Sequence, residues 1–386
     1  MMLLALFSCG AALGGCTPDD EPSNPAPTDA AAKDSPSADQ AADVVDADKA
    51  GLVARGLYLV NYVAACVDCH TPRLATGALD VTKHLAGSPV PFADVVPDEA
   101  GPDGGLGKIY APNLTPDMGT GLGQWSDEQI KKAFLDGVDK DGEPLFPAMP
   151  YYALHNMTDG DADAIVAYLR SINPITNSIP KREPVPGFTA PAMPVPIAAI
   201  PVSSIAMGQP NYDAAQRGRY LAGQIGACMV CHTKHVMAAV PIDTTKLFAG
   251  DEVFSLPPPF GDVHSSNITP DTNGIKGWTA KNVRDLLKLG TDDEGMRICP
   301  PMPAGPMKAF GGLTDEDALA IGHYLTTIPA ISTGMIPKCT LPPPPDAGST
   351  EGGGGDASDA AKTDSPTDDA LSSDAAIVDV RSPDGD

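Results

Sequence analysis

The sequence of 386 residues has few basic residues, few aromatic residues and no long apolar run after its first residues. Lysine and arginine number 25 against 50 aspartates and glutamates, so the basic surface typical of nucleic-acid-binding domains is not expected. Only 5% of residues are aromatic, which is sparse for cores in a chain of this length. No later segment is long and apolar enough to predict a transmembrane helix.

The acidic residues are concentrated at both ends of the chain. Residues 17–50 hold nine acidic residues against two lysines, and residues 341–386 hold eleven against one lysine and one arginine. Both stretches lack the large apolar residues whose burial would offset the entropy lost on ordering. We therefore predict a disordered acidic linker over 17–50 and a disordered acidic tail over 341–386.

Residues 1–16 resemble an export signal that ends in a bacterial lipobox. A short apolar run leads into Leu-Gly-Gly-Cys at residues 13–16, and in lipoproteins such a cysteine becomes the lipidated first residue. We predict a signal peptide over 1–16 with lipidation at Cys16. Cys9 is a weaker candidate, and an ordinary secretory signal remains the alternative.

An internal repeat organises the chain between the two acidic ends. We assign the first copy to residues 51–178 and the second to 212–340, joined by an extended Pro-rich linker over 179–211 that is expected to pack along both. Order and approximate spacing are kept, which chance does not explain. The matched positions are Arg55 and Arg217, Tyr58 and Tyr220, Asn113 and Asn267, Trp125 and Trp278, Met149 and Met302, and Thr158 and Thr314.

Each copy shows helical patterns. Residues 126–129 read Ser-Asp-Glu-Gln, a capping box followed by Ile130 and Phe134 at helical spacing. Thr158 precedes a second helical pattern, and the second copy repeats both starts at Thr279 and Thr314. We predict an all-α fold, with long Gly- and Pro-rich loops within each copy.

Each copy contains one Cys-x-x-Cys-His motif, the mark of covalently attached haem c. In this motif, two cysteines bond one porphyrin and the next residue, histidine, coordinates its iron. We assign haem attachment to Cys66, Cys69, Cys228 and Cys231, and iron ligation to His70 and His232. A zinc site would need two further ligands in regular knuckles, and a redox dithiol a βαβ context, so both alternatives are disfavoured.

The second axial ligand of each haem is assigned to a methionine in a Pro-restricted loop. Met149 and Met302 occupy matched positions between prolines, downstream of a predicted helix. A thioether favours reduced iron and occupies the site at which a substrate would bind. Met296 and Met307 compete with Met302 for this role.

Two cysteines remain, Cys299 and Cys339. Because an exported chain passes through an oxidising compartment, we predict a disulfide that stiffens the Met302 loop. Two buried free thiols are the alternative.

These motifs resemble the class I type of cytochrome c domain, used twice. Asn-Leu-Thr-Pro-Asp at 113–117, Trp-Ser-Asp-Glu-Gln at 125–129 and Pro-Ala-Met-Pro-Tyr at 147–151 are similar to the cytochrome c subunits of periplasmic alcohol and gluconate dehydrogenases. The resemblance covers about residues 50–178 and 212–335. It implies two tandem domains, each helical around one covalent haem, with His/Met ligation by His70 and Met149 and by His232 and Met302.

The sequence therefore predicts a dihaem electron carrier, not itself an enzyme, on the periplasmic side of a bacterial envelope. It would act as a relay or as a dehydrogenase subunit, between a dehydrogenase donor and a respiratory-chain acceptor. A two-haem peroxidase needs an open iron position, and a haem-based sensor needs a displaceable ligand and an output domain. Both remain as alternatives.

Overall fold

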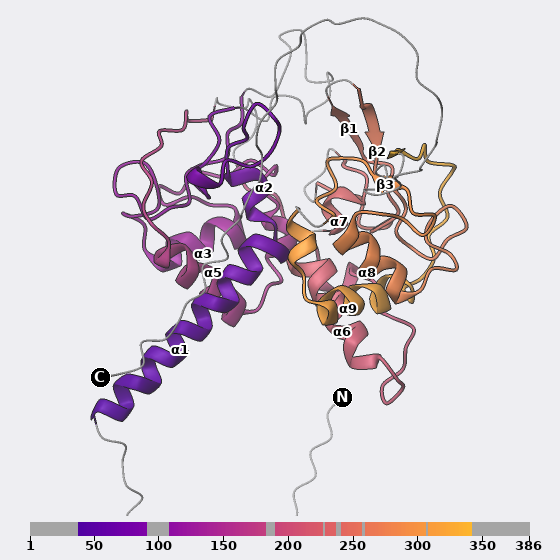
Figure 1. Cartoon of the computed structure of the whole chain (residues 1–386), viewed down its shortest axis with the longest axis horizontal. Helices are drawn as coiled ribbons and strands as arrows, with labels where there is room; N and C mark the ends of the chain where they lie inside the picture. The colour runs from indigo at the N-terminus through magenta and orange to yellow at the C-terminus, as the bar shows by residue number, and fades with distance from the viewer. Residues whose placement is uncertain are drawn as a thin grey trace, which may run out of the picture. The chain divides into compact units, whose positions relative to one another are not determined.

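The computed structural model describes residues 38–90, 108–182, 190–226, 228–236, 241–256, 259–305 and 308–341. All of these residues belong to one compact unit (Figure 1). The predicted signal peptide, Cys16, residues 17–37 and the tail from residue 342 lie outside the described residues. Within them, no helix combines the length and the apolar composition that crossing a membrane would require.

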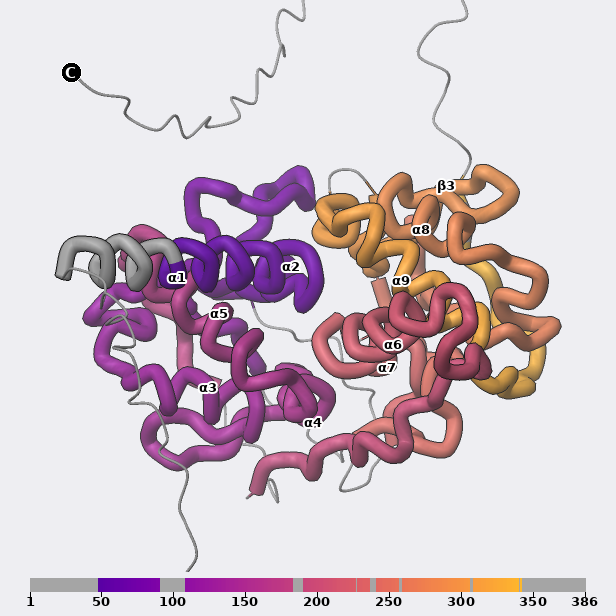
Figure 2. The backbone as a smooth tube through the Cα atoms, turned by 90° about the horizontal axis from the view of Figure 1, so that it is seen from below, coloured from indigo at the N-terminus to yellow at the C-terminus, as the bar shows by residue number. Residues whose placement is uncertain are grey.

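The two copies repeat one order of helices (Figures 1 and 2). The first copy contains α1 (Ala38–Tyr58), the π-helical turn η1 (Leu59–Val63), α2 (Cys66–His70), the 3-10 turn η2 (Val81–Lys83), α3 (Asp127–Asp136), α4 (Tyr151–Leu154) and α5 (Asp159–Ser171). The second contains α6 (Tyr212–Tyr220), the π-helical turn η4 (Leu221–Ile225), α7 (Cys228–Cys231), α8 (Ala280–Leu289), the 3-10 turn η5 (Ala309–Gly312) and α9 (Asp315–Leu325). A further 3-10 turn, η3 (Ile197–Ala199), lies between them.

Helices α3 and α8 begin and end as the repeat predicts. The Ser126 hydroxyl accepts from the Gln129 N–H and the Gln129 side chain accepts from the Ser126 N–H, which closes a capping box. Thr279 forms the equivalent box at α8. Gly137 and Gly290 end the two helices in the left-handed conformation, which glycine adopts without steric cost.

The first and last helices of each copy cross at a glycine. An added Cβ at Gly56 would lie 1.9 Å from the Ala164 carbonyl oxygen, and one at Gly218 would lie 1.9 Å from that of Ala320. Both crossings also contact the tyrosine one turn later, Tyr168 or Tyr324. Glycine at these two positions therefore allows the close approach of the helices.

Two small antiparallel sheets correct the prediction that the fold is all-α. Strands β1 (Val253–Leu256) and β2 (Gly261–His264) form a hairpin in the long loop of the second copy. Strands β3 (Arg297–Ile298) and β4 (Thr340–Leu341) pair close to Cys299 and Cys339. Both sheets lie in segments that the helical repeat does not define, and their pairing partners are far less local than those of a helix. The fold is mainly helical, with these additions.

Helix α1 also corrects the predicted extent of the N-terminal acidic linker. It begins at Ala38, so residues 38–50, predicted to be disordered, are helical. The segment is rich in alanine, the best helix former. The packed half of α1 already provides a helical nucleus. Residues added at its N-terminal end therefore extend an existing helix and do not incur the free-energy cost of nucleating a new one.

The two copies contact each other through two tyrosines, Tyr220 and Tyr58, each of which forms hydrogen bonds to the other copy. Arg55 pairs with Asp161 of its own copy, with Nε–Oδ1 at 2.8 Å and Nη2–Oδ2 at 2.9 Å. Tyr220 of the second copy donates its hydroxyl to Asp161 Oδ2 at 2.8 Å and accepts from the Thr158 N–H at 3.1 Å. Residues of both copies therefore contribute to the N-terminal cap of helix α5.

The reciprocal contact is present at the start of α9. Arg217 pairs with Asp317, and Tyr58 of the first copy donates to Asp317 Oδ2 at 2.7 Å and accepts from the Thr314 N–H at 3.2 Å. Asp317 is 3% exposed, so its charge depends on these partners. Hydrogen bonds to charged groups contribute about 1.5–3 kcal/mol each. The repeated Arg-Gly-x-Tyr sequence thus encodes the contact between the copies.

The described part of the linker is extended and bonded to both copies. The Ala192 N–H donates to the Tyr151 hydroxyl and the Val195 N–H to the Tyr152 carbonyl, each at 2.8 Å. On the second copy, the Tyr324 hydroxyl donates to the Pro201 carbonyl at 2.8 Å. These bonds restrain how far the two copies can move apart.

Two glycines of α1 provide a matched test of the helix crossing. Gly56→Ala should lower the free energy of unfolding by about 1–3 kcal/mol or more, because its Cβ would meet backbone that cannot move freely. Gly51→Ala, in the same helix with nothing within 4 Å of the added Cβ, should instead raise stability by about 0.5–1 kcal/mol. Denaturant unfolding of the two variants measures both effects. Equal effects would contradict the proposed crossing.

Candidate haem-attachment sites

Each Cys-x-x-Cys-His motif forms one short helix that follows a π-helical turn. In the first copy, η1 ends before Ala65, which takes the left-handed conformation and turns the chain into α2. In the second copy, η4 precedes α7, and residue 227 between them lies outside the described residues. The four motif cysteines are free thiols and are not joined to one another.

The two motif histidines are held by the same hydrogen bond. His70 Nδ1 lies 2.8 Å from the Pro112 carbonyl oxygen, and His232 Nδ1 lies 2.7 Å from that of Ser266. Since a carbonyl oxygen only accepts, Nδ1 carries the proton and Nε2 keeps its lone pair. Burial also lowers the pKa of both rings, which favours the neutral form. A neutral imidazole with a free Nε2 is the form that binds a metal ion.

The chain around each histidine is fixed by matched backbone bonds. The carbonyls of His70 and His232 accept from the N–H groups of Gly87 and Gly250, at 2.8 and 2.7 Å. Gly87 has a φ of +82° and no room for a side chain, because an added Cβ would lie 2.7 Å from the Asn113 nitrogen. A glycine is therefore required beneath the histidine.

The threonines after the two motifs were not singled out by sequence reasoning. The hydroxyls of Thr71 and Thr233 accept from the N–H groups of Leu85 and Phe248, each at 3.0 Å. Thr71 and Thr233 are 2% and 0% exposed. The signal was present in the sequence, because both motifs read Cys-His-Thr. These bonds hold the following loop against the histidine.

Asn113 and Asn267 order the loops that carry the histidine-binding carbonyls. Asn113 Oδ1 accepts from the Thr115 N–H at 2.9 Å, and Asn113 Nδ2 donates to the Ile175 carbonyl at 2.8 Å. Asn267 makes the corresponding bonds to Thr269 and Ile331. These bonds tie each loop to the segment after the last helix.

The motif thiols have high pKa values. Burial is the main cause, and it raises the pKa of Cys66 to about 12 and that of Cys69 to about 11. A redox dithiol works through a thiolate whose pKa is lowered, so the direction of these shifts disfavours a redox dithiol. Among the described residues, no three His, Cys, Asp or Glu side chains converge as a metal site would require.

The two motifs lie near each other across the boundary between the copies. The turn η1 contacts η4. Burial raises the pKa of the Cys231 thiol to about 11, and the charge of Cys69 in the other copy adds to this shift. The turns that precede the two motifs are therefore in contact across the boundary.

Met149 and Met302 both lie partly buried against the apolar core. Met118 is 63% exposed and Met157 is buried at 7%, as expected for surface and packing residues. Of the competitors of Met302, Met296 is partly buried but not part of the packing against the core. Met307 lies outside the described residues. The core contact therefore favours Met302 over Met296.

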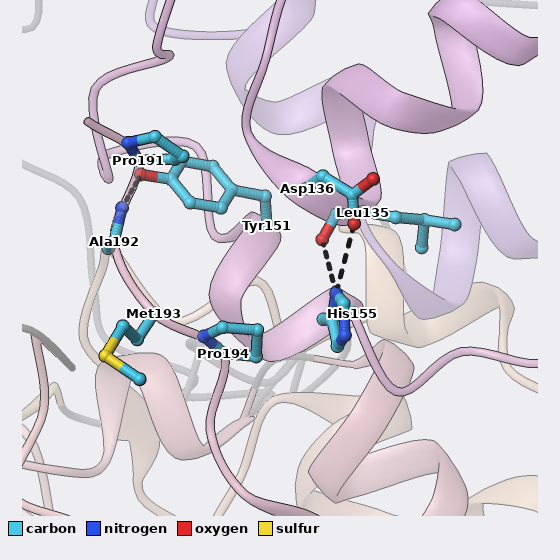
Figure 3. A pocket seen from close by; sticks show the side chains of 8 residues that line it. All are labelled: Leu135, Asp136, Tyr151, His155, Pro191, Ala192, Met193 and Pro194. Atoms are coloured by element: carbon cyan, nitrogen blue, oxygen red, sulfur yellow. Dashed lines mark hydrogen bonds and ion pairs between the residues drawn. The ribbon is translucent and has the colours of Figure 1, made fainter.

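The remaining side chains have structural roles. His84 bonds the Tyr168 hydroxyl, His235 pairs with Glu252, and His264 pairs with Asp251. His155 pairs with Asp136 and bonds the Leu135 carbonyl in a small pocket of the first copy, beside residues 191–194 (Figure 3). Trp125 and Trp278 pack against the core.

Cys299 and Cys339 form a disulfide next to the Met302 loop, with their sulfurs 2.04 Å apart. Cys299 is 3% exposed, and the adjacent strands β3 and β4 pair Ile298 with Thr340. The cross-link joins the loop before Met302 to the last described strand.

Residues 53–173 match the model of a domain family described as Cytochrome c. Such a domain carries covalently bound haem c. The chain is also similar to the cytochrome subunits of several dehydrogenases. It is 30% identical to the fructose dehydrogenase cytochrome subunit of Gluconobacter japonicus, over 72% of this chain and 53% of that protein.

Two other relatives are similar to this chain over a comparable share of its length. The gluconate 2-dehydrogenase cytochrome c subunit of Pantoea cypripedii is 29% identical over 72% of this chain and 60% of that protein. A diheme cytochrome c-type protein of Cereibacter sphaeroides is 24% identical over 70% of this chain and 84% of its own length. The chain thus spans little more than half the length of the dehydrogenase subunits and most of the diheme protein.

Removal of the Cys299–Cys339 disulfide tests its contribution to stability. Because it closes a loop with a sequence separation of 40, the double alanine variant should lose about 2–4 kcal/mol of unfolding free energy. Each single alanine variant should lose a similar amount, since either change breaks the bond. Denaturant unfolding without added reductant measures this. A double variant as stable as the parent would show that the bond contributes nothing.

Proposed function

We propose that the protein is a dihaem c-type cytochrome that transfers electrons and does not itself catalyse a substrate reaction. The observation that carries the proposal is the matched pair of neutral histidines, each with Nδ1 bonded to a carbonyl and Nε2 left to bind iron. Covalent haem supplies one-electron cycling between Fe(II) and Fe(III) when it is bound. The similarity to cytochrome subunits and to a diheme cytochrome supports the same function.

In this proposal, the chain supplies attachment, ligands and orientation. Cys66 and Cys69 hold the first haem and Cys228 and Cys231 the second, while His70 and His232 provide one ligand to each iron. Met149 and Met302 provide the other ligand. The Nδ1–H bonds to Pro112 and Ser266 fix the plane of each imidazole and keep Nε2 available.

Closed coordination by two protein ligands distinguishes a carrier from the alternatives. A dihaem peroxidase or a haem-based sensor needs a sixth position that opens. Both copies place a methionine against the core in the matched loop, which favours the carrier. Carbon monoxide binding by the reduced protein at neutral pH, or turnover of hydrogen peroxide, would instead support a sensor or a peroxidase.

The proximity of the two motifs supports an internal relay. The turns η1 and η4, which lead into the two motifs, contact each other across the boundary, and the cross-copy hydrogen bonds of Tyr58 and Tyr220 restrain that arrangement. An electron would then enter at one haem and leave from the other. We propose a dehydrogenase as the donor and a respiratory-chain component as the acceptor, either within a complex or as free partners.

The charge of the chain favours partners with basic surfaces. Acidic residues outnumber basic ones by 50 to 25 over the whole sequence. An acidic carrier is steered towards a positively charged partner, and the association rate then falls as salt rises.

The methionine assignments are tested by midpoint potentials. Met149→Ala should lower the potential of one haem and leave the other nearly unchanged, because a thioether favours reduced iron. Met302→Ala should lower the other potential. Met118→Ala and Met296→Ala are the matched controls and should leave both potentials in place. Spectroelectrochemical titration provides the values, and two unchanged potentials in Met149→Ala would show that Met149 is not a ligand.

We further propose export to the periplasmic side of the envelope and a lipid anchor at Cys16. Cys16→Ser should move the protein from the membrane fraction to the soluble fraction, because acyl chains would be its only strong attachment. Cys9→Ser, the matched control, should leave the distribution unchanged. Membrane retention by Cys16→Ser in high salt would contradict this anchor.

A further inference from the structure

The loops that hold His232 contain histidine and carboxylate side chains that the matched loops of the first copy lack. Two bonds hold His232: the Gly250 N–H donates to its carbonyl at 2.7 Å, and its own Nδ1–H donates to the Ser266 carbonyl at 2.7 Å. These bonds bring three segments together, residues 232–235, 250–252 and 264–266. Besides His232 itself, each segment contributes a titratable side chain to one cluster.

Two histidine–carboxylate pairs link the three segments. His235 bonds Glu252 twice, with its backbone N–H 2.8 Å from Oε2 and its ring Nδ1 3.0 Å from Oε1. His264 Nδ1 lies 3.2 Å from Asp251 Oδ1, and Lys234 Nζ lies 3.3 Å from the other oxygen of Asp251. Because an ionised carboxylate only accepts, each Nδ1 carries a proton, and Nε2 is the site at which each ring can gain another.

Both rings reach water and can therefore exchange protons. The side chains of His235 and His264 are 39% and 26% exposed. Histidine is the side chain whose charge ordinarily changes between pH 5 and 8. Burial would raise the pKa of Asp251, but the hydrogen bonds from His264 and Lys234 outweigh burial and hold this pKa below its ordinary value. The carboxylate that faces His264 is therefore charged throughout the range in which the ring titrates.

The other titratable groups around the cluster do not account for a charge change near neutral pH. Asp262 in β2 accepts a hydrogen bond from the facing strand at 2.8 Å, and Asp243 accepts one within its own loop at 2.6 Å. Carboxylates change charge well below neutral pH. Tyr152 of the first copy interacts with Glu252, but burial is the main cause that raises the pKa of Tyr152, so this hydroxyl stays uncharged.

The first copy repeats the backbone bonds of these segments. The N–H of the residue after the histidine-binding glycine, Ser88 or Asp251, donates to the facing loop at 2.9 Å in both copies. The bonds therefore align the segments of the two copies residue by residue. The aligned triplets are Gly-Ser-Pro at 87–89 with Gly-Asp-Glu at 250–252, and Tyr-Ala-Pro at 110–112 with His-Ser-Ser at 264–266.

An arginine occupies the position of His235 in the first copy. Arg73 and His235 each lie three residues after the motif histidine, and each forms an isolated bridge with a residue further along the loop. Arginine keeps its charge at every pH at which the protein is folded. His84 of the first copy bonds the Tyr168 hydroxyl instead, and burial lowers the pKa of His84, which favours the neutral ring. The aligned residues of the first copy therefore contain no histidine–carboxylate pair.

A proton gained by the cluster favours one oxidation state of a haem bound at the second motif. Ferric iron carries one more positive charge than ferrous iron, so an added positive charge nearby stabilises the ferrous form relative to the ferric form. By linkage, reduction of the iron favours protonation of the same rings to the same extent. The potential of that haem should therefore rise as the pH falls from 8 to 5.

We propose that reduction of the haem bound at Cys228 and Cys231 is coupled to proton uptake by His235 and His264. The electron comes from the redox donor and the proton from water. Each imidazole gains its proton at Nε2 while Nδ1 stays bonded to its carboxylate, and oxidation of the haem releases the proton again. The inference rests on the proposed dihaem function, and it gives the second haem a response to pH that the first haem does not receive from these pairs.

The pH dependence of the two midpoint potentials in the full-length holoprotein tests this coupling. From pH 8 to pH 5, the second potential should rise more in the parent than in the variant carrying both His235→Gln and His264→Gln. The expected difference is about threefold in the ratio of ferrous to ferric haem, or about 28 mV at 59 mV for each tenfold change. The first potential should have the same pH dependence in both proteins. Met149→Ala and Met302→Ala assign each potential to its haem.

A second histidine–carboxylate pair in the chain provides the matched control. His155→Gln removes a ring whose Nδ1 lies 3.2 Å from Asp136 Oδ1, in the pocket of the first copy, and it should leave the pH dependence of the second potential unchanged. Glu252→Gln tests the same coupling from the carboxylate side. Because a carboxylate stabilises the protonated ring, its loss should move the pH dependence of the second potential to lower pH.

Proton uptake on reduction provides an independent readout. Reduction at about pH 6.5, followed with a pH indicator, should take up fewer protons in the double variant than in the parent. The inference is overturned if the double variant keeps the parent's pH dependence of the second potential, if only the first potential changes, or if proton uptake is the same in both proteins.

Haem content is measured for every variant. If the double variant loses haem, Glu252→Gln decides the question, because glutamine keeps an oxygen that can accept from the His235 N–H. An unchanged pH dependence in Glu252→Gln would then overturn the coupling. A parent protein that does not bind two haems would overturn the proposed function instead, so the two failures are distinguishable.

Discussion

The hydrogen bond from the Nδ1–H of each motif histidine to a backbone carbonyl is the constraint on which the site depends. It selects one tautomer, fixes the plane of the ring and leaves Nε2 free. The carbonyl that accepts this bond must itself be held in place, and further hydrogen bonds of the surrounding chain do this. Gly87 and Gly250 bind the histidine carbonyls, while Asn113 and Asn267 tie the loops to the end of each domain.

The same repeat also encodes the contact between the domains. Tyr58 and Tyr220 each leave their own domain to bond an aspartate that an arginine of the other domain already neutralises. The Arg-Gly-x-Tyr pattern therefore has two roles. Its tyrosine bonds to the other copy, and its glycine, Gly56 or Gly218, allows the first and last helices of its own copy to pack closely. A gene duplication explains why both ends of the contact carry the same residues, because the two halves began identical.

Departures from the repeat are where the two domains acquire different properties. Tyr152 and Lys308 both lie six residues before the cap of the last helix of their copy, yet Tyr152 is buried and Lys308 is exposed. The hairpin of β1 and β2 and the Cys299–Cys339 disulfide occur only in the second domain of the described chain. Such asymmetry distinguishes two copies that otherwise share one sequence pattern.

The sequence by itself determined the two Cys-x-x-Cys-His motifs and the helix starts, because these are local patterns with fixed spacing. Cys66 to His70 span one helical turn, and Ser126 with Gln129 closes a capping box without help from distant residues. The α1 start and the two small sheets escaped prediction, since a helix can extend from a packed neighbour and strand pairs join residues far apart. Only the tertiary structure decided that Pro112 and Ser266 orient the histidines and that Tyr58 and Tyr220 bond to the other copy. Those contacts join segments that are remote in sequence, and no local pattern records which segments will meet.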